Sequence, residues 1–189
     1  MPRLWSETIE EHRRAVREAT LDATAALVAA QGLTSLTMSQ IAEAAGIGRA
    51  TLYRHFPDVQ AILGAWHERQ IAAHLHHLAE VGNRPGDVGQ RLAAVLETYA
   101  HLSGHLHGAD LGAVLHRGDH VGQARHRLRD FLRDLIAEGV ATGELRDDVP
   151  AGELATFCLH ALGGAGEMPS EAAVRRLVAL TVGGLLPPR

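Results

Sequence analysis

The stretch from Leu36 to Phe56, LTMSQIAEAAGIGRATLYRHF, constrains this chain more than any other part of it. Thr37 is a residue type that caps helix N-termini, and Gly46 is suited to a tight turn. Apolar residues four apart mark one face of a helix on each side of that turn, namely Ile41 and Ala45, then Leu52 and Phe56. The pattern predicts two short helices packed at a steep angle, which is a helix-turn-helix unit.

The second of these helices has an outward face suited to DNA. Leu52 and Phe56 define its buried side, and no acidic residue occurs between Gly46 and Phe56. The residues that remain on its exposed sides are Arg49, Ala50, Thr51, Tyr53 and Arg54. A guanidinium, a hydroxyl, a phenol and a methyl group suit phosphates and base edges in a major groove. The face therefore predicts a DNA-reading helix.

The segment TMSQIAEAAGIGRATLYRHFPDVQAIL resembles the DNA-binding signature of the TetR (tetracycline-repressor) family of bacterial transcription regulators. The resemblance covers roughly residues 8–66, and the TLYRHF core is its most specific part. Two positions depart from the family pattern. Gly48 stands where Ser is common, which predicts a weaker helix cap. Val59 stands where Lys is usual, which removes one expected phosphate contact.

With this resemblance, the predicted domains are a helix-turn-helix DNA-binding domain at residues 1–57 and a helical effector-binding and dimerisation domain at residues 58–189. The predicted DNA contacts are Thr37, Ser39, Arg49, Ala50, Thr51, Tyr53, Arg54 and His55. Charge alone gives no such indication, since the net charge is −4. On the preceding helix, Arg13, Arg14 and Arg17 either reach the DNA backbone or pair with neighbouring glutamates.

Helical spacing of apolar residues continues along the chain, and no run alternates apolar with polar residues as a strand would. A capping box at Thr8 predicts the start of the first helix, and Gly32 predicts its end. Further helices are expected at about 58–82, 87–106, 110–115, 119–143, 150–165 and 170–184. The predicted fold class is all-α.

The last two helices carry more apolar surface than one packing side needs, and the glycines Gly163, Gly164 and Gly183 permit close approach between helices. They predict a homodimer that pairs them in a four-helix bundle, with burial in the chain's own core as the alternative. The resemblance also implies a dimerisation region here. A twofold dimer would present two recognition helices to a pseudo-palindromic operator in double-stranded DNA.

The resemblance further implies a small-molecule effector in the C-terminal domain. The candidate contacts come from the helices that enclose the family's effector pocket, and they are Trp66, Tyr99, Leu102, His116, His120, Phe131, Leu135 and Cys158. Each of them could instead be packed core, because apolar residues at helical spacing are usually structural. Since few of these residues carry charge, the expected effector is mostly apolar.

Other function classes lack their signatures. His101 with His105, and His116 with His120, have a spacing that can chelate a metal, but no carboxylate or Cys accompanies them, so we expect neither metal nor cofactor. The chain has no HExxH, GxSxG or phosphate-loop motif, so we expect no enzyme. No apolar run is long enough for a membrane span, and a single Cys excludes an internal disulfide. These features predict a cytoplasmic protein.

The main hypothesis is therefore a ligand-responsive transcriptional regulator. We expect a repressor whose dimer binds an operator and is released when an effector changes the spacing of the two DNA-reading heads. The resemblance implies that the helix beginning near Asp58 transmits this change. The alternative is a helical metal-binding or small-molecule-binding protein with weakened DNA binding, which the valine at position 59 and the near-zero N-terminal charge would favour.

Overall fold

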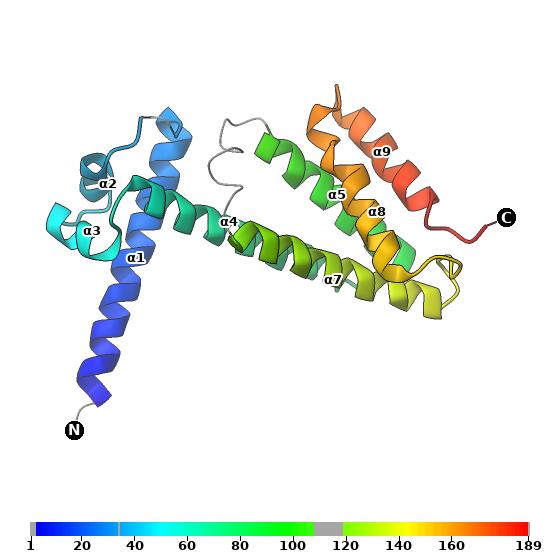
Figure 1. The fold of residues 1–189 in the computed structure, drawn as a ribbon, viewed down its shortest axis with the longest axis horizontal. Coiled ribbons are helices and arrows are strands. Elements are labelled where there is room, and N and C mark those ends of the chain that lie inside the picture. Colours follow the sequence, from blue (N-terminus) through cyan, green and yellow to red (C-terminus); the bar gives the residue numbers. More distant parts are fainter. Residues whose placement is uncertain (1–2, 34, 108–118, 189) are drawn as a thin grey trace. The chain divides into compact units, whose positions relative to one another are not determined.

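A computed structural model describes residues 3–33, 35–107 and 119–188, and it confirms the all-α class (Figure 1). This part of the chain contains helices and turns and no strand. The elements are α1 (Arg3–Gln31), α2 (Met38–Ala44), α3 (Arg49–His55), α4 (Val59–Gly82), α5 (Val88–His107), α7 (Asp119–Ala141), α8 (Ala151–Gly163), the 3₁₀ helix η1 (Ala165–Glu167) and α9 (Glu171–Gly183). The helix expected at 110–115 lies outside the described residues.

The chain packs into two compact units, residues 1–70 and 71–189. The division falls within α4, so this helix contributes residues to both units. The division expected after residue 57, between a DNA-binding domain and an effector-binding domain, stays a prediction. None of the described helices is long and apolar enough to cross a membrane.

The core of the first unit joins α1, α2, α3 and the start of α4. Its buried side chains are Leu21, Met38, Ile41, Ala42, Leu52, Phe56 and Ile62. Two buried threonines of α1 keep their hydroxyls satisfied, because Thr20 donates to the Val16 carbonyl at 2.7 Å and Thr24 donates to the Thr20 carbonyl at 2.8 Å. The seam predicted between the two short helices is thus part of a larger core that α1 completes.

The capping box predicted at Thr8 is wrong, because α1 already begins at Arg3. Residues 3–8 contain no Gly or Pro, so no residue in this stretch breaks the helix between Arg3 and Thr8. The predicted end is confirmed. Gly32 follows α1 with a φ of +75°, and its N–H donates to the Val28 carbonyl at 3.0 Å.

Side chains also cap the starts of later helices. The Asp58 carboxylate accepts from the Ala61 N–H at 2.8 Å, ahead of α4. The Asp87 carboxylate accepts from the Gln90 N–H at 2.7 Å, ahead of α5. Ser170 caps α9 in the same way, and Gly143 follows α7 with a φ of +75°.

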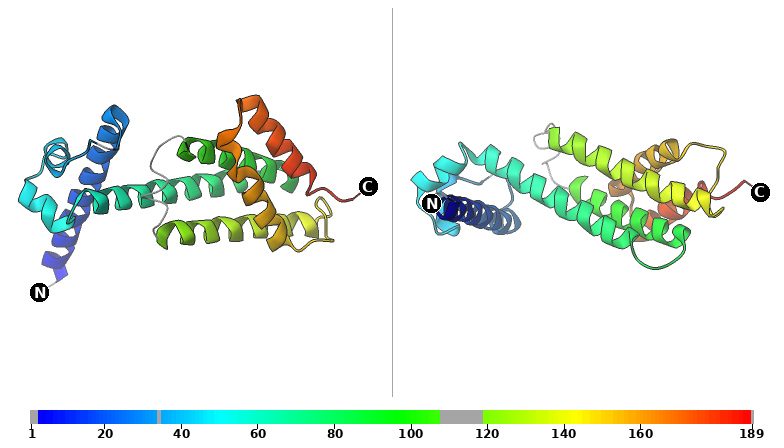
Figure 2. Two further views of the ribbon diagram at one scale, coloured as in Figure 1. Left: turned by 45° about the horizontal axis from the view of Figure 1, so that its top comes forward. Right: turned by 90° about the horizontal axis from the view of Figure 1, so that it is seen from below.

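In the second unit α5 packs against α7, α8 and α9, as the views in Figure 2 show. Its buried face supplies Leu92, Val95, Leu96 and Ala100 to the core. At the edge of this core Arg91 joins three elements: its Nε donates to the Gly82 carbonyl at the end of α4, and its Nη1 pairs with Glu138 of α7 at 2.7 Å. That guanidinium satisfies a carbonyl that the α4 C-terminus leaves open.

Candidate nucleic-acid interface

The first helix of the helix-turn-helix unit is fixed by a reciprocal cap. The Thr37 hydroxyl accepts from the Gln40 N–H at 3.3 Å, while the Gln40 side-chain oxygen accepts from the Thr37 N–H at 3.0 Å. The Thr37 hydroxyl also donates to that same oxygen at 2.7 Å. The cap function predicted for Thr37 is confirmed, and its hydroxyl is already engaged on both sides.

The turn between α2 and α3 depends on a glycine. Gly46 has a φ of +66°, a conformation that side chains with a Cβ rarely adopt, and the Ile47 N–H donates to the Ala42 carbonyl at 3.0 Å. Gly48 then starts α3 without any side-chain cap, as its identity predicts. Leu52 is completely buried, so α3 is held through its inner face.

The outer face of α3 presents most of the predicted DNA contacts to solvent. Tyr53 has 55% of its surface exposed, and Arg49, Ala50 and Arg54 are exposed beside it. Arg49 Nη1 donates to the Ser39 hydroxyl on α2 at 3.4 Å, which brings two predicted contacts from different helices together. Arg54 Nη2 donates to the Thr51 hydroxyl at 3.3 Å within α3. The face carries donors and an aromatic ring and no carboxylate of its own.

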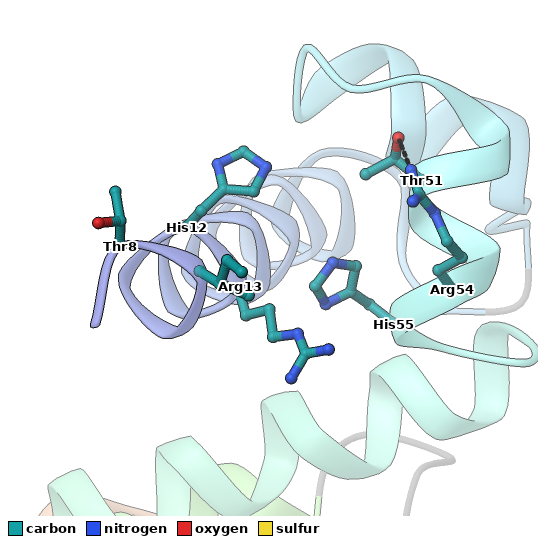
Figure 3. A pocket seen from close by; sticks show the side chains of 7 residues that line it. Thr8, His12, Arg13, Thr51, Arg54 and His55 are labelled. Carbon is teal, nitrogen blue, oxygen red and sulfur yellow. Dashed lines mark hydrogen bonds between the residues drawn. The ribbon is translucent and has the colours of Figure 1, made fainter. Parts of the chain in front are cut away.

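A groove of about 780 Å³ separates this end of α3 from α1 (Figure 3). The side chains that line it are Thr8, Ile9, His12 and Arg13 from α1, and Thr51, Arg54 and His55 from α3. Figure 3 shows Arg13 and His55 reaching into the space between the two helices. Three of these residues, Thr51, Arg54 and His55, belong to the predicted contact set. Thr8, Ile9 and His12 do not, because sequence spacing does not show which face of α1 passes α3.

The arginines of α1 differ in their surroundings. Arg13 pairs with Glu10 at 2.9 Å, which is the intrahelical pairing considered for it. Arg17 lies over the ring of Phe56, with 5.2 Å between its guanidinium carbon and the ring centroid. Glu18 instead pairs with Arg69 of α4 at 2.9 Å. Val59, which departs from the Lys that the resemblance implies, is half-buried and packed against the first core.

The predicted effector contacts divide between the two cores. Trp66 packs against the core of the first unit. In the second unit, Leu135 and Cys158 are buried and Tyr99, Leu102 and Phe131 pack against that core. His120 is half-buried at the start of α7, and His116 lies outside the described residues. Their role toward an effector stays a prediction.

Three of these side chains have a distinct local setting. Phe131 fills the space beside Gly82, where an added Cβ would lie 2.5 Å from its Cζ, so its ring sets the approach of α4 to α7. Burial raises the pKa of the Cys158 thiol to about 12, which keeps it protonated and unreactive. The indole N–H of Trp66 is buried and has no acceptor within the described residues.

Within the described part of the chain, no group of three His, Cys, Asp or Glu side chains is placed to hold a metal ion. The exposed arginines of α7 include Arg133, which pairs with Asp130 at 3.1 Å and with Asp134 at 2.8 Å. This pairing with Asp134 and Asp130 raises the pKa of Arg133.

Comparison with known proteins agrees with this geometry. The model of the tetR family of bacterial regulatory proteins matches residues 21–65, which span the end of α1, the helix-turn-helix unit and the start of α4. The chain carries the DNA-binding domain of the TetR family. No curated protein matches the chain.

Solved structures are similar to this chain over most of its length. A TetR/AcrR-family transcriptional regulator from Thermobifida fusca has a TM-score of 0.73 and 22% identity, covering 89% of this chain and 97% of that one. The regulator FadR from Bacillus subtilis, in complex with stearoyl-CoA, has a TM-score of 0.67 and 16% identity, with coverage of 89% and 98%. A complex of SmeT with triclosan has a TM-score of 0.62 and 19% identity, with coverage of 91% and 92%. These likenesses establish the TetR fold for both units.

Proposed function

We propose that this protein is a ligand-responsive transcriptional repressor that acts in the cytoplasm as a homodimer on a pseudo-palindromic operator. The observation that carries the proposal is the outer face of α3. There Tyr53 is exposed beside Arg49, Ala50 and Arg54, on a helix whose opposite side is buried. A helix held this way can enter a major groove with its donors toward the base edges. The proposed function includes no catalytic step.

The dimer is proposed to form through α8 and α9. Leu180 on α9 has 74% of its surface exposed, and Phe157 on α8 has 48% exposed. The two helices meet near these residues, since a Cβ on Gly184 would lie 3.6 Å from the Phe157 ring. Large apolar side chains exposed together on a monomer favour a partner surface, and a second copy places two α3 helices on one DNA.

The effector is proposed to be small and mostly apolar. Its contacts are proposed to come from the residue set Trp66, Tyr99, Leu102, His116, His120, Phe131, Leu135 and Cys158. Two structural relatives are named as ligand complexes, one with stearoyl-CoA, whose acyl chain is apolar, and the other with triclosan, an aromatic compound. The indole N–H of Trp66, which has no acceptor among the described residues, is proposed to donate to an acceptor group on such a molecule.

DNA binding tests the proposal most directly. The purified chain is titrated with duplexes that tile the region upstream of its own coding sequence, at several salt concentrations. We expect salt-sensitive binding to one of these duplexes. We expect Tyr53→Ala with Arg54→Ala to weaken it at least about tenfold, because a lost base contact from Tyr53 costs about 1–3 kcal/mol and the loss of Arg54 removes a cationic contact as well. The matched control is Arg127→Ala on the solvated face of α7, which should bind as the unaltered chain does.

Two results would contradict this function. The first is an absence of salt-sensitive binding to any tiled duplex. The second is equal binding by the Tyr53→Ala, Arg54→Ala variant. Stoichiometric metal retained by a chain that binds none of the duplexes would favour the alternative, a helical metal-binding protein that no longer reads DNA.

A further inference from the structure

We propose that the groove between α1 and α3 holds a phosphate of the DNA backbone, so that α1 becomes a second DNA-contacting element. This inference rests on the proposed function and extends it to a site that α1 completes. The contact that the sequence does not indicate is His12. It acts together with Arg13 of the same helix and with Arg54 and His55 across the groove.

The composition of the groove suits an oxyanion. Two guanidinium groups and two imidazoles are among its lining residues, and none of the described side chains that line it is acidic. Thr8 and Thr51 add hydroxyl groups at its wall. Arginine binds phosphate with parallel N–H donors, and a neutral or protonated imidazole can also donate to a phosphate oxygen.

The position of the groove suits a backbone phosphate more than a free one. An α-helix with its side chains is about 10–12 Å across, which nearly fills a major groove about 12 Å wide. Side chains on the flank of a seated α3 therefore meet the phosphates at the edge of that groove. Arg54 and His55 lie on the flank of α3 that faces α1, as their place in the groove shows (Figure 3).

The apolar residue in the groove fits the same partner. Ile9 has 50% of its surface exposed, although it is a large aliphatic side chain on a helix that buries others. Next to a phosphate, a DNA backbone presents the apolar face of a deoxyribose. The cationic and hydroxyl groups would then meet the phosphate while Ile9 packs against the sugar.

The first two turns of α4 carry no basic side chain. Val59 packs half-buried against the first core and offers no charge to a backbone phosphate. The groove supplies cationic groups from α1 instead. The ion pair between Arg13 and Glu10 is weak, because both side chains are exposed and exposed ion pairs contribute little free energy. A phosphate can therefore displace the carboxylate.

The test measures the salt dependence of binding to a mixed-sequence DNA duplex, a probe that reports phosphate contacts without knowledge of the operator. We expect His12→Gln with Arg13→Gln to lower the slope of log affinity against log salt by about 1 for each recognition helix bound. The matched control is His126→Gln with Arg127→Gln, an adjacent exposed His-Arg pair on α7. Its slope should equal that of the unaltered chain.

A second variant tests the same site while leaving all the side chains that line the groove unchanged. Glu10→Gln removes the competing carboxylate and should tighten binding to the same duplex severalfold, while Glu97→Gln, an exposed glutamate on α5, should not match that gain. Equal slopes in the unaltered chain and the His12, Arg13 variant would overturn the proposal. Equal losses in the variant and its α7 control would also overturn it, because they would reflect net charge alone.

Two further results distinguish a site for a DNA phosphate from a site for free phosphate and from failure of the proposed function. If inorganic phosphate at matched ionic strength displaces the duplex more than chloride does, while the slope of the variant is unchanged, the groove binds free phosphate and the DNA assignment fails. If the unaltered chain binds no duplex at all, the proposed function itself fails. If the His12, Arg13 variant still binds the duplex and its salt slope equals that of the unaltered chain, only the proposal for the groove fails.

Discussion

At the residue scale, the hydrogen bonds at the ends of the short helices follow from local sequence. Thr37 is predicted as a cap, and the structure adds that Gln40 returns the bond to its N–H. Gly48 is predicted to cap poorly, and α3 indeed starts without a side-chain bond. Thr8 fails as a cap, since the same residue pattern inside a continuous helix has no open N–H to satisfy. Whether a capping pattern acts as one depends on what precedes it.

A prediction at this scale concerns His74 on α4. Its pKa is lowered by burial and by the neighbouring His77. The unfolded chain then binds a proton more readily than the folded one, so this residue's contribution to stability is present above the ordinary pKa of 6.5 and is lost as pH falls below it. We expect His74→Gln to reduce the drop in melting temperature between about pH 8 and about pH 5.5.

The measurement is thermal unfolding followed by circular dichroism at both pH values. His126→Gln on the exposed face of α7 serves as the control and should show the same drop as the unaltered chain. A drop in the His74 variant as large as that of the unaltered chain would show that this side chain does not link protonation to folding.

At the element scale, each long helix is recognisable from its apolar spacing, yet the faces that meet are fixed by small residues. Gly82 leaves room for the Phe131 ring between α4 and α7. Gly139 leaves room for Leu145, the buried residue of the loop that follows α7. The sequence identifies these glycines as helical positions but does not show which side chain fills the space beside each one.

The α7 glycines allow a matched prediction. At Gly139 an added Cβ would lie 2.6 Å from Leu145 Cδ1 and 2.7 Å from its Cγ, so we expect Gly139→Ala to lower the free energy of unfolding by about 1–3 kcal/mol. At Gly122, on the same helix, nothing lies within 4 Å, so Gly122→Ala should raise it by up to about 1 kcal/mol. Urea unfolding of both variants measures the difference, and equal effects would contradict the close packing at Gly139.

At the scale of the whole molecule, the proposed function depends on two copies. A single α3 helix makes few base contacts, whereas two helices on one twofold axis read both halves of an operator. The apolar side chains of α8 and α9 that remain exposed in one chain are the surface available for this pairing, and Leu180 is the most exposed of them. Dimerisation therefore controls DNA affinity under this proposal.

We expect Leu180→Glu to abolish the dimer and to weaken operator binding strongly, because a charge at the centre of an apolar interface is costly to bury. Light scattering on a size-exclusion column should give twice the mass of one chain for the unaltered protein and one chain mass for the variant. Ala137→Glu on the exposed face of α7 is the control and should remain dimeric. A dimeric Leu180→Glu protein would place the interface elsewhere.

The sequence by itself determined the all-α class, the helix-turn-helix unit and the outward face of α3, because helical spacing, caps and turn glycines are local properties. Only the tertiary structure decided which surfaces meet. It buried Cys158 in the second core, stacked Arg17 on Phe56 and brought His12 and Arg13 of α1 beside Arg54 and His55. These pairings join residues distant in the chain, and the packing of helices that sets them depends on the shapes of all the buried side chains together.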